Sequence, residues 1–172
     1  MTTANTPPPP LILTCLIDSD AAAFFNRLRK EHFPPERNYL DAHLTLFHHL
    51  PAEEPSILST IRELCRQQPS IHLDIREVVF TGKGVAYRID SPVLKQLHRG
   101  LQERWKPWLT PQDKQGLWPH ITVQNKVDPS TARLLQKELA SSFTPFQATA
   151  LGLQAWEYQG GPWGLVETCL FV

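Results

Sequence analysis

Apolar and polar residues alternate in the segment AHLTLFHHL, which begins at Ala42. Successive side chains of a β-strand point to opposite faces, so His43 and Thr45 share one face. Leu44 and Leu46 occupy the other face, where they can pack into a core. The pattern predicts a half-buried strand over about 40–49.

The segment PHITVQNKV, which begins at Pro119, repeats this arrangement. His120 and Thr122 share one face, and Ile121 and Val123 share the other. A second strand with the same functional groups is therefore predicted over about 118–125. One His-x-Thr motif has little meaning, because threonine suits strands in any case, but a second copy in a matching strand is informative.

Helical spacing of apolar residues, N-cap residues and turn residues predict the other elements. The predicted helices cover about 20–31, 53–66, 92–105 and 129–140. The other predicted strands cover about 11–17, 71–81, 85–89, 147–156 and 165–172, and a loop is expected at 106–117.

The order strand, helix, motif strand, helix, strand occurs twice. His43 and His120 lie 77 positions apart, and the elements that follow each motif keep about this offset. The Ile-Asp-Ser sequence at 17–19 recurs at 89–91, which implies a short insertion before the second motif. These offsets indicate an internal two-fold repeat. Two halves packed about a pseudo-two-fold axis can direct both His/Thr pairs into one cleft.

Two imidazoles and two hydroxyls suit phosphodiester chemistry without a metal. Histidine has an ordinary pKa near ~6.5, so one ring can accept a proton while the other donates one. Threonine hydroxyls can donate hydrogen bonds to the non-bridging phosphate oxygens. If the second strand continues, Lys126 shares the face of His120 and can add positive charge for substrate binding.

The motifs His43-Leu44-Thr45-Leu46 and His120-Ile121-Thr122-Val123, in a duplicated chain of this length, resemble the 2H phosphoesterase superfamily. This superfamily includes 2′-5′ RNA ligase-like and cyclic nucleotide phosphodiesterase proteins. The resemblance extends from Leu11 to the end of the chain. It implies an α+β bilobal duplicated fold, with two antiparallel sheets around a central cleft and helices outside.

The resemblance assigns catalytic roles to His43 and His120, and phosphate-binding roles to Thr45 and Thr122. The implied activity is metal-independent hydrolysis, or reversible ligation, of 2′,3′-cyclic or 2′-5′ phosphodiester bonds in nucleotides or RNA ends, without a cofactor. The alternative is a non-catalytic nucleotide- or phosphate-binding module with the same cleft. A protein in which the four residues merely pack is a weaker third alternative.

Bulk composition narrows the class of partner. The 172 residues include 17 basic and 17 acidic side chains, so no net charge attracts long duplex nucleic acid. The longest apolar run is far shorter than the ~20 residues of a spanning helix. Residues 1–10 are expected to form a disordered or extended tail, and residues 11–172 one bilobal domain. We expect a cytoplasmic, monomeric protein with three reduced cysteines.

Other residues have simpler explanations. His48 and His49 point to opposite faces of the predicted strand, so they do not form a metal site with His43. Trp118, Phe47 and Tyr87 are possible base-stacking residues, although core packing is the preferred interpretation of each. Trp156 and Trp163 flank a predicted Gly-Gly-Pro turn and are expected to pack there.

Overall fold

The structure, a computed structural model, describes residues 6–172. Its four α-helices are α1 (Ser19–His32), α2 (Pro55–Cys65), α3 (Pro92–Trp105) and α4 (Pro129–Ser142). Its strands are β1 (Leu11–Ile17), β2 (Leu44–Leu50), β3 (Ile71–Phe80), β4 (Val85–Asp90), β5 (His120–Gln124), β6 (Phe146–Tyr158) and β7 (Trp163–Leu170). Two 3₁₀ turns, η1 (Pro35–Arg37) and η2 (Lys106–Trp108), complete the element order.

The predicted helices are confirmed to within two residues at each end. Their N-termini follow the expected capping chemistry, because the Asp18 side chain accepts a hydrogen bond from Ala21 N and the Ser91 side chain accepts one from Leu94 N. The two motif strands are shorter than predicted: β2 begins one residue after His43, and β5 begins at His120 itself. Each histidine therefore lies at the N-terminal end of its strand.

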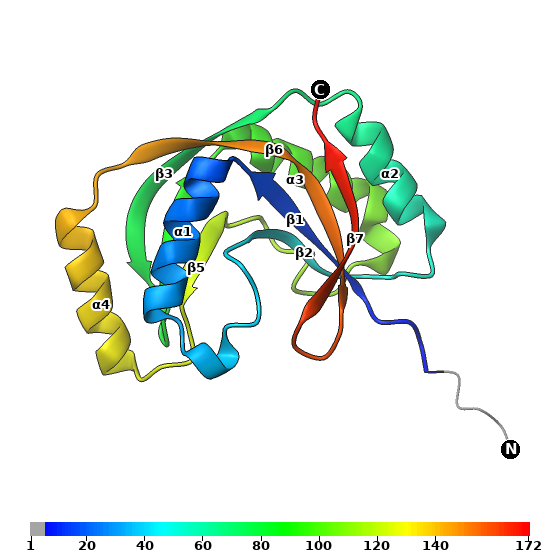
Figure 1. The fold of residues 1–172 in the computed structure, drawn as a ribbon. Coiled ribbons are helices and arrows are strands. Elements are labelled where there is room, and N and C mark those ends of the chain that lie inside the picture. Colours follow the sequence, from blue (N-terminus) through cyan, green and yellow to red (C-terminus); the bar gives the residue numbers. More distant parts are fainter. Residues whose placement is uncertain (1–5) are drawn as a thin grey trace, which may run out of the picture.

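All strand pairings are antiparallel, and the strand order is β2-β1-β6-β3-β4-β5, with β7 paired to β6. The sheet is strongly curled, as Figure 1 shows. The strands β2 and β5 stand at opposite ends of this order, yet they contact each other. The curl thus brings the two His-x-Thr strands together across the interior of a half-barrel.

The two halves of the repeat exchange their third strands. β3, from the first half, pairs with β4 of the second, whereas β6, from the second half, pairs with β1 of the first. β3 and β6 also pair with each other through Ile71–Ile75 and Phe146–Ala150. The predicted bilobal α+β fold is confirmed. The expected two sheets are joined along this seam into one continuous seven-stranded sheet, because each half crosses over to complete the other.

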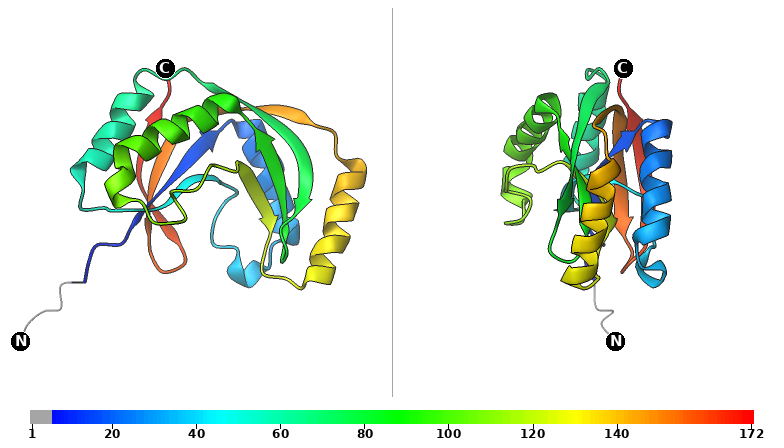
Figure 2. Two further views of the ribbon diagram at one scale, coloured as in Figure 1. Left: turned by 180° about the vertical axis from the view of Figure 1, so that it is seen from behind. Right: turned by 90° about the vertical axis from the view of Figure 1, so that its left-hand side faces the viewer.

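The helices follow the same exchange, and they cover the outside of the sheet (Figures 1 and 2). Helices α1 and α4 lie against the lobe built from β3, β4 and β5: Phe24 and Phe25 of α1 contact Tyr87 of β4, with ring centroids 5.8 and 5.4 Å apart. Helix α3 lies against the first half, where His98 stacks on Phe47. A single apolar core runs beneath both lobes.

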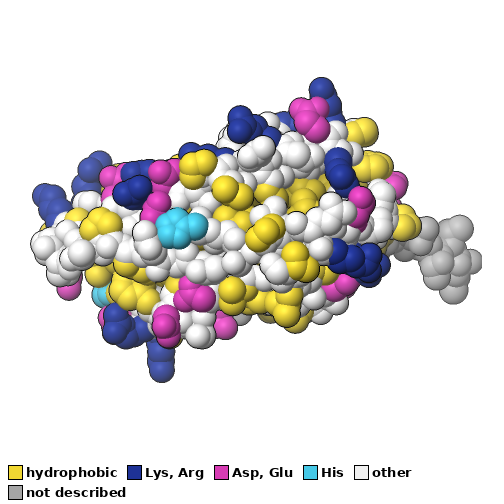
Figure 3. All heavy atoms as spheres, turned by 90° about the horizontal axis from the view of Figure 1, so that it is seen from above, with side chains coloured by type: hydrophobic (Ala, Val, Ile, Leu, Met, Phe, Trp, Pro, Cys, Tyr) yellow, Lys and Arg dark blue, Asp and Glu magenta, His cyan; other side chains and the backbone are white. Residues whose placement is uncertain are grey.

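The surface carries charges of both signs. The face seen in Figure 3 mixes basic, acidic and apolar side chains. No helix within residues 6–172 is long and apolar enough to cross a membrane. Of the predicted tail, residues 1–5 lie outside the described residues, whereas Pro7–Pro10 line a hollow together with Trp108.

Candidate active site

The two motif histidines are held in the same way. Nδ1 of His43 lies 2.7 Å from the carbonyl oxygen of Asp41, and Nδ1 of His120 lies 2.7 Å from the carbonyl oxygen of Trp118. A carbonyl oxygen only accepts hydrogen bonds, so Nδ1 carries the proton in both rings. In the neutral ring, the lone pair is then on Nε2. Each motif thus presents Nε2 as the nitrogen that can exchange a proton with a ligand.

The motif threonines occupy equivalent positions in the sheet. Thr45 pairs with Thr14 of β1, and Thr122 pairs with Ala86 of β4. Both threonines are partly exposed, whereas the alternate motif residues, such as Leu44 and Ile121, are fully buried. The predicted division into a core face and a functional face is therefore confirmed for both strands.

Arg29 of α1 connects the two motif strands. It is only 5% exposed, and its Nη1 donates to the carbonyl oxygen of Thr122 at 3.0 Å. Its Nε donates at 2.9 Å to Oδ1 of Asn38 and at 2.9 Å to the carbonyl oxygen of Leu40. One guanidinium therefore holds β5 against the segment that leads into His43. Burial lowers the pKa of Arg29 to about 10, although Asp41 opposes this shift, so the group stays cationic at neutral pH.

The histidines lie in an environment that favours their neutral forms. Burial lowers the pKa of His43 to about 4; the hydrogen bond to Asp41 opposes this shift, and the positive charges of Arg29 and protonated His120 add to it. Burial also lowers the pKa of His120, against the opposing hydrogen bond to Trp118. Positive charge on His120 lowers the pKa of His43, and positive charge on His48 lowers the pKa of both rings. The two rings therefore share one electrostatic environment. A bound phosphate anion would counter these effects and raise both pKa values.

A tryptophan packs against each histidine. Trp118 stacks on His120, with ring centroids 4.1 Å apart and an interplanar angle of 26°, and it is 45% exposed. Trp163, at the start of β7, lies 4.7 Å from the His43 ring at 53°. Of the base-stacking candidates from the sequence, Phe47 and Tyr87 are buried in the core. Trp118 alone among these three is open to a ligand.

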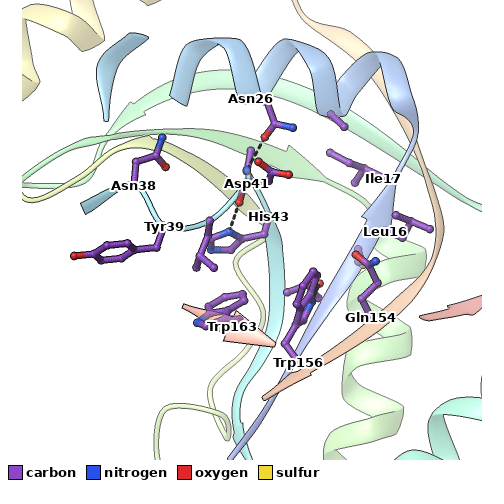
Figure 4. A pocket seen from close by; sticks show the side chains of 15 residues that line it. Leu16, Ile17, Asn26, Asn38, Tyr39, Asp41, His43, Gln154, Trp156 and Trp163 are labelled. Carbon is purple, nitrogen blue, oxygen red and sulfur yellow. Dashed lines mark hydrogen bonds between the residues drawn. The ribbon is translucent and has the colours of Figure 1, made fainter. Parts of the chain in front are cut away.

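A cavity of about 540 Å³ opens beside His43 (Figure 4). Its floor is formed by β1 and β6, and its sides by α1, the segment 38–42 and Trp163. None of its lining residues comes from β5, so the cavity belongs to the His43 side of the site. The duplicated motif is symmetric, whereas the space for a ligand around it is not.

Lys126 lies apart from this group. The strand β5 ends at Gln124, and Lys126 adopts a left-handed conformation with φ of 62° in the turn that follows. It lines a separate hollow with Arg37 and Lys83. The strand does not continue, so the alternation that placed Lys126 on the face of His120 no longer applies.

His48 and His49 take part in a contact that holds a loop against β2. The buried Asp113 accepts hydrogen bonds from the backbone nitrogens of both residues, at 2.9 Å from each, and its Oδ1 lies 3.1 Å from His48 Nδ1. This carboxylate anchors the predicted loop to β2. Within residues 6–172, no group of three His, Cys, Asp or Glu side chains is placed to hold a metal ion. Metal independence itself remains a prediction.

Two residues with a place in the site escaped the sequence analysis. Arg29 lies among exposed basic residues of α1, and its burial depends on contacts with residues up to 93 positions away. Trp163 was expected only to pack in a turn. The alternation of β7 gives no sign that it reaches His43, because that contact depends on the β6–β7 hairpin folding back over the site.

Comparison with known proteins gives a family and a fold. Residues 17–162 match the family model of the 2′-5′ RNA ligase superfamily. The crystal structure of TT0787 from Thermus thermophilus has a TM-score of 0.66 at 16% identity, covering 94% of this chain and 97% of that one. Escherichia coli LigT complexed with 3′-AMP has a TM-score of 0.62 at 20% identity, covering 96% and 99%. LigT complexed with NADP⁺ has a TM-score of 0.59 at 20% identity, covering 97% and 99%.

No curated protein sequence matches the chain. The structural neighbours are too distant in sequence to indicate more than the fold, but the family match spans most of the chain and includes both His-x-Thr motifs. The chain therefore belongs to the 2′-5′ RNA ligase superfamily, within the 2H phosphoesterases that its paired motifs resemble.

Proposed function

We propose that this protein is a metal-independent phosphodiesterase that opens 2′,3′-cyclic phosphates, or cleaves and reversibly forms 2′-5′ linkages, in nucleotides or at RNA ends. One observation carries the proposal: two histidines from equivalent strands each have Nδ1 fixed by a carbonyl oxygen two residues earlier, at 2.7 Å in both cases. Both rings are thereby fixed in the tautomer that offers Nε2 to a substrate.

In the proposed hydrolysis, the phosphate lies between His43 and His120. Nε2 of one neutral ring takes a proton from water as the water oxygen attacks phosphorus. Nε2–H of the other, protonated ring gives a proton to the ribose oxygen as its bond to phosphorus breaks. Thr45 and Thr122 donate hydrogen bonds to the non-bridging oxygens, whose charge must be stabilised in the transition state. The product is a phosphomonoester with a free neighbouring hydroxyl.

Two further observations support a nucleotide as the substrate. Complexes of the structural neighbour LigT contain 3′-AMP, NADP⁺ and ATP, so this fold accommodates nucleotides in that protein. The balanced charge of this chain favours small or terminal substrates over long nucleic acid.

The test is an assay on the four nucleoside 2′,3′-cyclic phosphates and on RNA with cyclic phosphate or 2′-5′ ends, in buffer with EDTA. We expect turnover that EDTA does not reduce, and a loss of at least ~10² to 10⁴ in rate for His43→Ala and for His120→Ala. His49→Ala is the matched control, because His49 is exposed on the motif strand β2 and its Asp113 contact is made by the backbone.

Full activity of the double variant His43→Ala/His120→Ala would overturn the proposed mechanism. Tight binding of nucleoside monophosphates in calorimetry, with no turnover of any substrate in the panel, would instead identify a non-catalytic binding module.

A further inference from the structure

We propose that the cavity beside His43 is a nucleoside pocket, and that its aromatic and amide side chains hold the base and ribose on the His43 side of the scissile phosphate. This inference rests on the proposed function for the position of the phosphate. It adds a recognition site and its residues to the two catalytic motifs.

The size and position of the cavity suit one nucleoside. About 540 Å³ lies within the ~300 to 1,000 Å³ typical of small-molecule sites. His43 is itself part of the lining, so a ligand in the cavity lies directly beside the proposed reacting phosphate. Figure 4 shows the His43 ring among the lining side chains, with Trp163 and Trp156 on one side of it and Tyr39 on another.

The aromatic side chains offer flat surfaces for a base. The centroids of Trp156 and Trp163 are 6.2 Å apart, and the rings are inclined at 54°. Trp156 is fixed by a hydrogen bond of 2.9 Å from its Nε1 to Oγ1 of Thr14. Tyr39 is 62% exposed at the rim. Stacking on such rings accepts any base, because every base has an aromatic face.

Two amide groups in the lining are oriented by contacts within the protein. Oδ1 of Asn26 accepts the backbone N–H of Ala42 at 2.7 Å, and Oδ1 of Asn38 accepts Nε–H of Arg29 at 2.9 Å. Both bonds have an unambiguous donor, so each side chain must present its NH₂ group elsewhere. Asn26 and Asn38 therefore offer hydrogen-bond donors to acceptors on a base or ribose.

The lining also provides acceptors. Asp41 contributes a carboxylate, which suits a ribose hydroxyl, and Gln154 of the floor strand β6 contributes an amide oxygen. A cavity with flat apolar sides and a few oriented polar groups at its edges is complementary to a nucleoside. A bare phosphate or sugar phosphate would leave the aromatic sides unused.

The experiment compares two substrates that share the reacting group: adenosine 2′,3′-cyclic phosphate and 1-O-methylribose 2′,3′-cyclic phosphate, which has no base. The measured quantity is the ratio of their kcat/KM values. We expect the native protein to favour the nucleotide by at least about 10-fold, and Trp163→Leu to reduce this ratio by about 10-fold. Because both substrates need His43, any effect of the substitution on that ring cancels in the ratio.

Trp108→Leu is the matched control, since Trp108 is partly buried beside Pro7–Pro10 and does not line the cavity. We expect it to leave the ratio unchanged. Gln154→Leu is a second test variant that lines the cavity, and we expect it to lower the ratio by about 3- to 10-fold. A ratio near one in the native protein, or the same ratio in Trp163→Leu as in the native protein, would overturn the pocket.

Calorimetry distinguishes a failure of the proposed pocket from a failure of the proposed function. Adenosine 3′-monophosphate and ribose 3-phosphate are titrated into the native protein and into Trp163→Leu. The pocket predicts tighter binding of the adenosine compound, lost in the variant, whether or not any substrate is turned over. Equal affinity for the two compounds in the native protein would contradict the pocket even if the enzyme were active.

Discussion

Nη1 of Arg29 donates a hydrogen bond to the carbonyl oxygen of Thr122, 93 positions further along the chain, at 3.0 Å. The same guanidinium holds the segment that precedes His43 through Asn38 and Leu40. A buried cation with these three contacts sets the separation of the motif strands. Arg29 is thus a positioning residue, which acts on the reaction through the placement of both motifs.

Arg29→Lys should separate position from charge. Lysine keeps the cation but lacks the planar fork that reaches three oxygen atoms at once. We expect kcat to fall by about 10- to 100-fold while circular dichroism stays native, because displacement of catalytic groups by about 1 Å costs this much. The control is Arg27→Lys on the same helix, whose exposed guanidinium lies over Phe24. Equal activity of both variants would remove the positioning role.

Thr45→Val and Thr122→Val test the phosphate contacts. Valine matches the shape of threonine and preserves its strand preference but cannot donate a hydrogen bond. Each variant should lose about 10²-fold in kcat, the usual effect of removing one donor to transition-state charge. Thr45→Ser and Thr122→Ser should retain most activity. If the valine and serine variants behave alike in steady-state kinetics, the hydroxyls do not act as donors.

The lowered histidine pKa values predict an acid-shifted profile of kcat/KM, which reports the free enzyme. The active form needs one neutral and one protonated ring, and it is most abundant between the two pKa values. Because burial lowers the pKa of His43 to about 4 and also lowers that of His120, the optimum of kcat/KM should lie below pH 6.5. A bound phosphate raises both pKa values, so the kcat profile should lie at higher pH. An optimum of kcat/KM above pH 7.5 would contradict this electrostatic description.

Asp113→Asn should destabilise the fold. Burial alone would raise the pKa of Asp113, but the hydrogen bonds from the His48 side chain and from the backbone of His48 and His49 lower it below its ordinary value. The Asp113 carboxylate therefore stabilises the fold at pH values above its pKa in the unfolded state, ~3.9. This stabilisation is lost as the pH falls through the lower pKa of the folded state.

An asparagine side chain offers one oxygen where the carboxylate offers two, so donors near Asp113 lose their partner. We expect urea denaturation at pH 7 to show a loss of about 1 to 3 kcal/mol. The control, Asp128→Asn, changes an exposed N-cap without a side-chain hydrogen bond and should differ from the native protein by less than about 0.5 kcal/mol. Similar losses in the free energy of unfolding for both variants would show that the buried Asp113 contributes no more to stability than an exposed aspartate.

Local patterns in the sequence were sufficient for the elements and the motif faces. Leu44 and Ile121 are buried and Thr45 and Thr122 are partly exposed, as strand alternation requires. The bilobal arrangement was implied by the family resemblance that the paired motifs carry. These features depend on residues that are close together in the sequence, or on a motif that the sequence repeats. Both kinds of information are present in a single sequence.

The remaining features depend on contacts between distant segments. The exchange of β3 and β6 between halves, the burial of Arg29 and the contact of Trp163 with His43 all depend on how the sheet curls. The placement of Lys126 on the face of His120 required the strand to continue, and that condition is not met, because β5 ends at Gln124 and the backbone turns there. The hydrogen bonds from both Nδ1 atoms to backbone carbonyl oxygens depend on where each motif strand begins. In the structure each strand begins at its histidine or one residue after it.

The exchanged third strands have a consequence for how the chain reaches its native state. With β3 completing the later half and β6 the earlier one, neither copy of the repeat contains its own full set of strand partners. A fragment that ends between Phe80 and Val85 would expose one edge of β1 and leave β3 without β4 and β6. Folding must therefore include β6 before either motif reaches its native environment. The sites around the two histidines form in the same step.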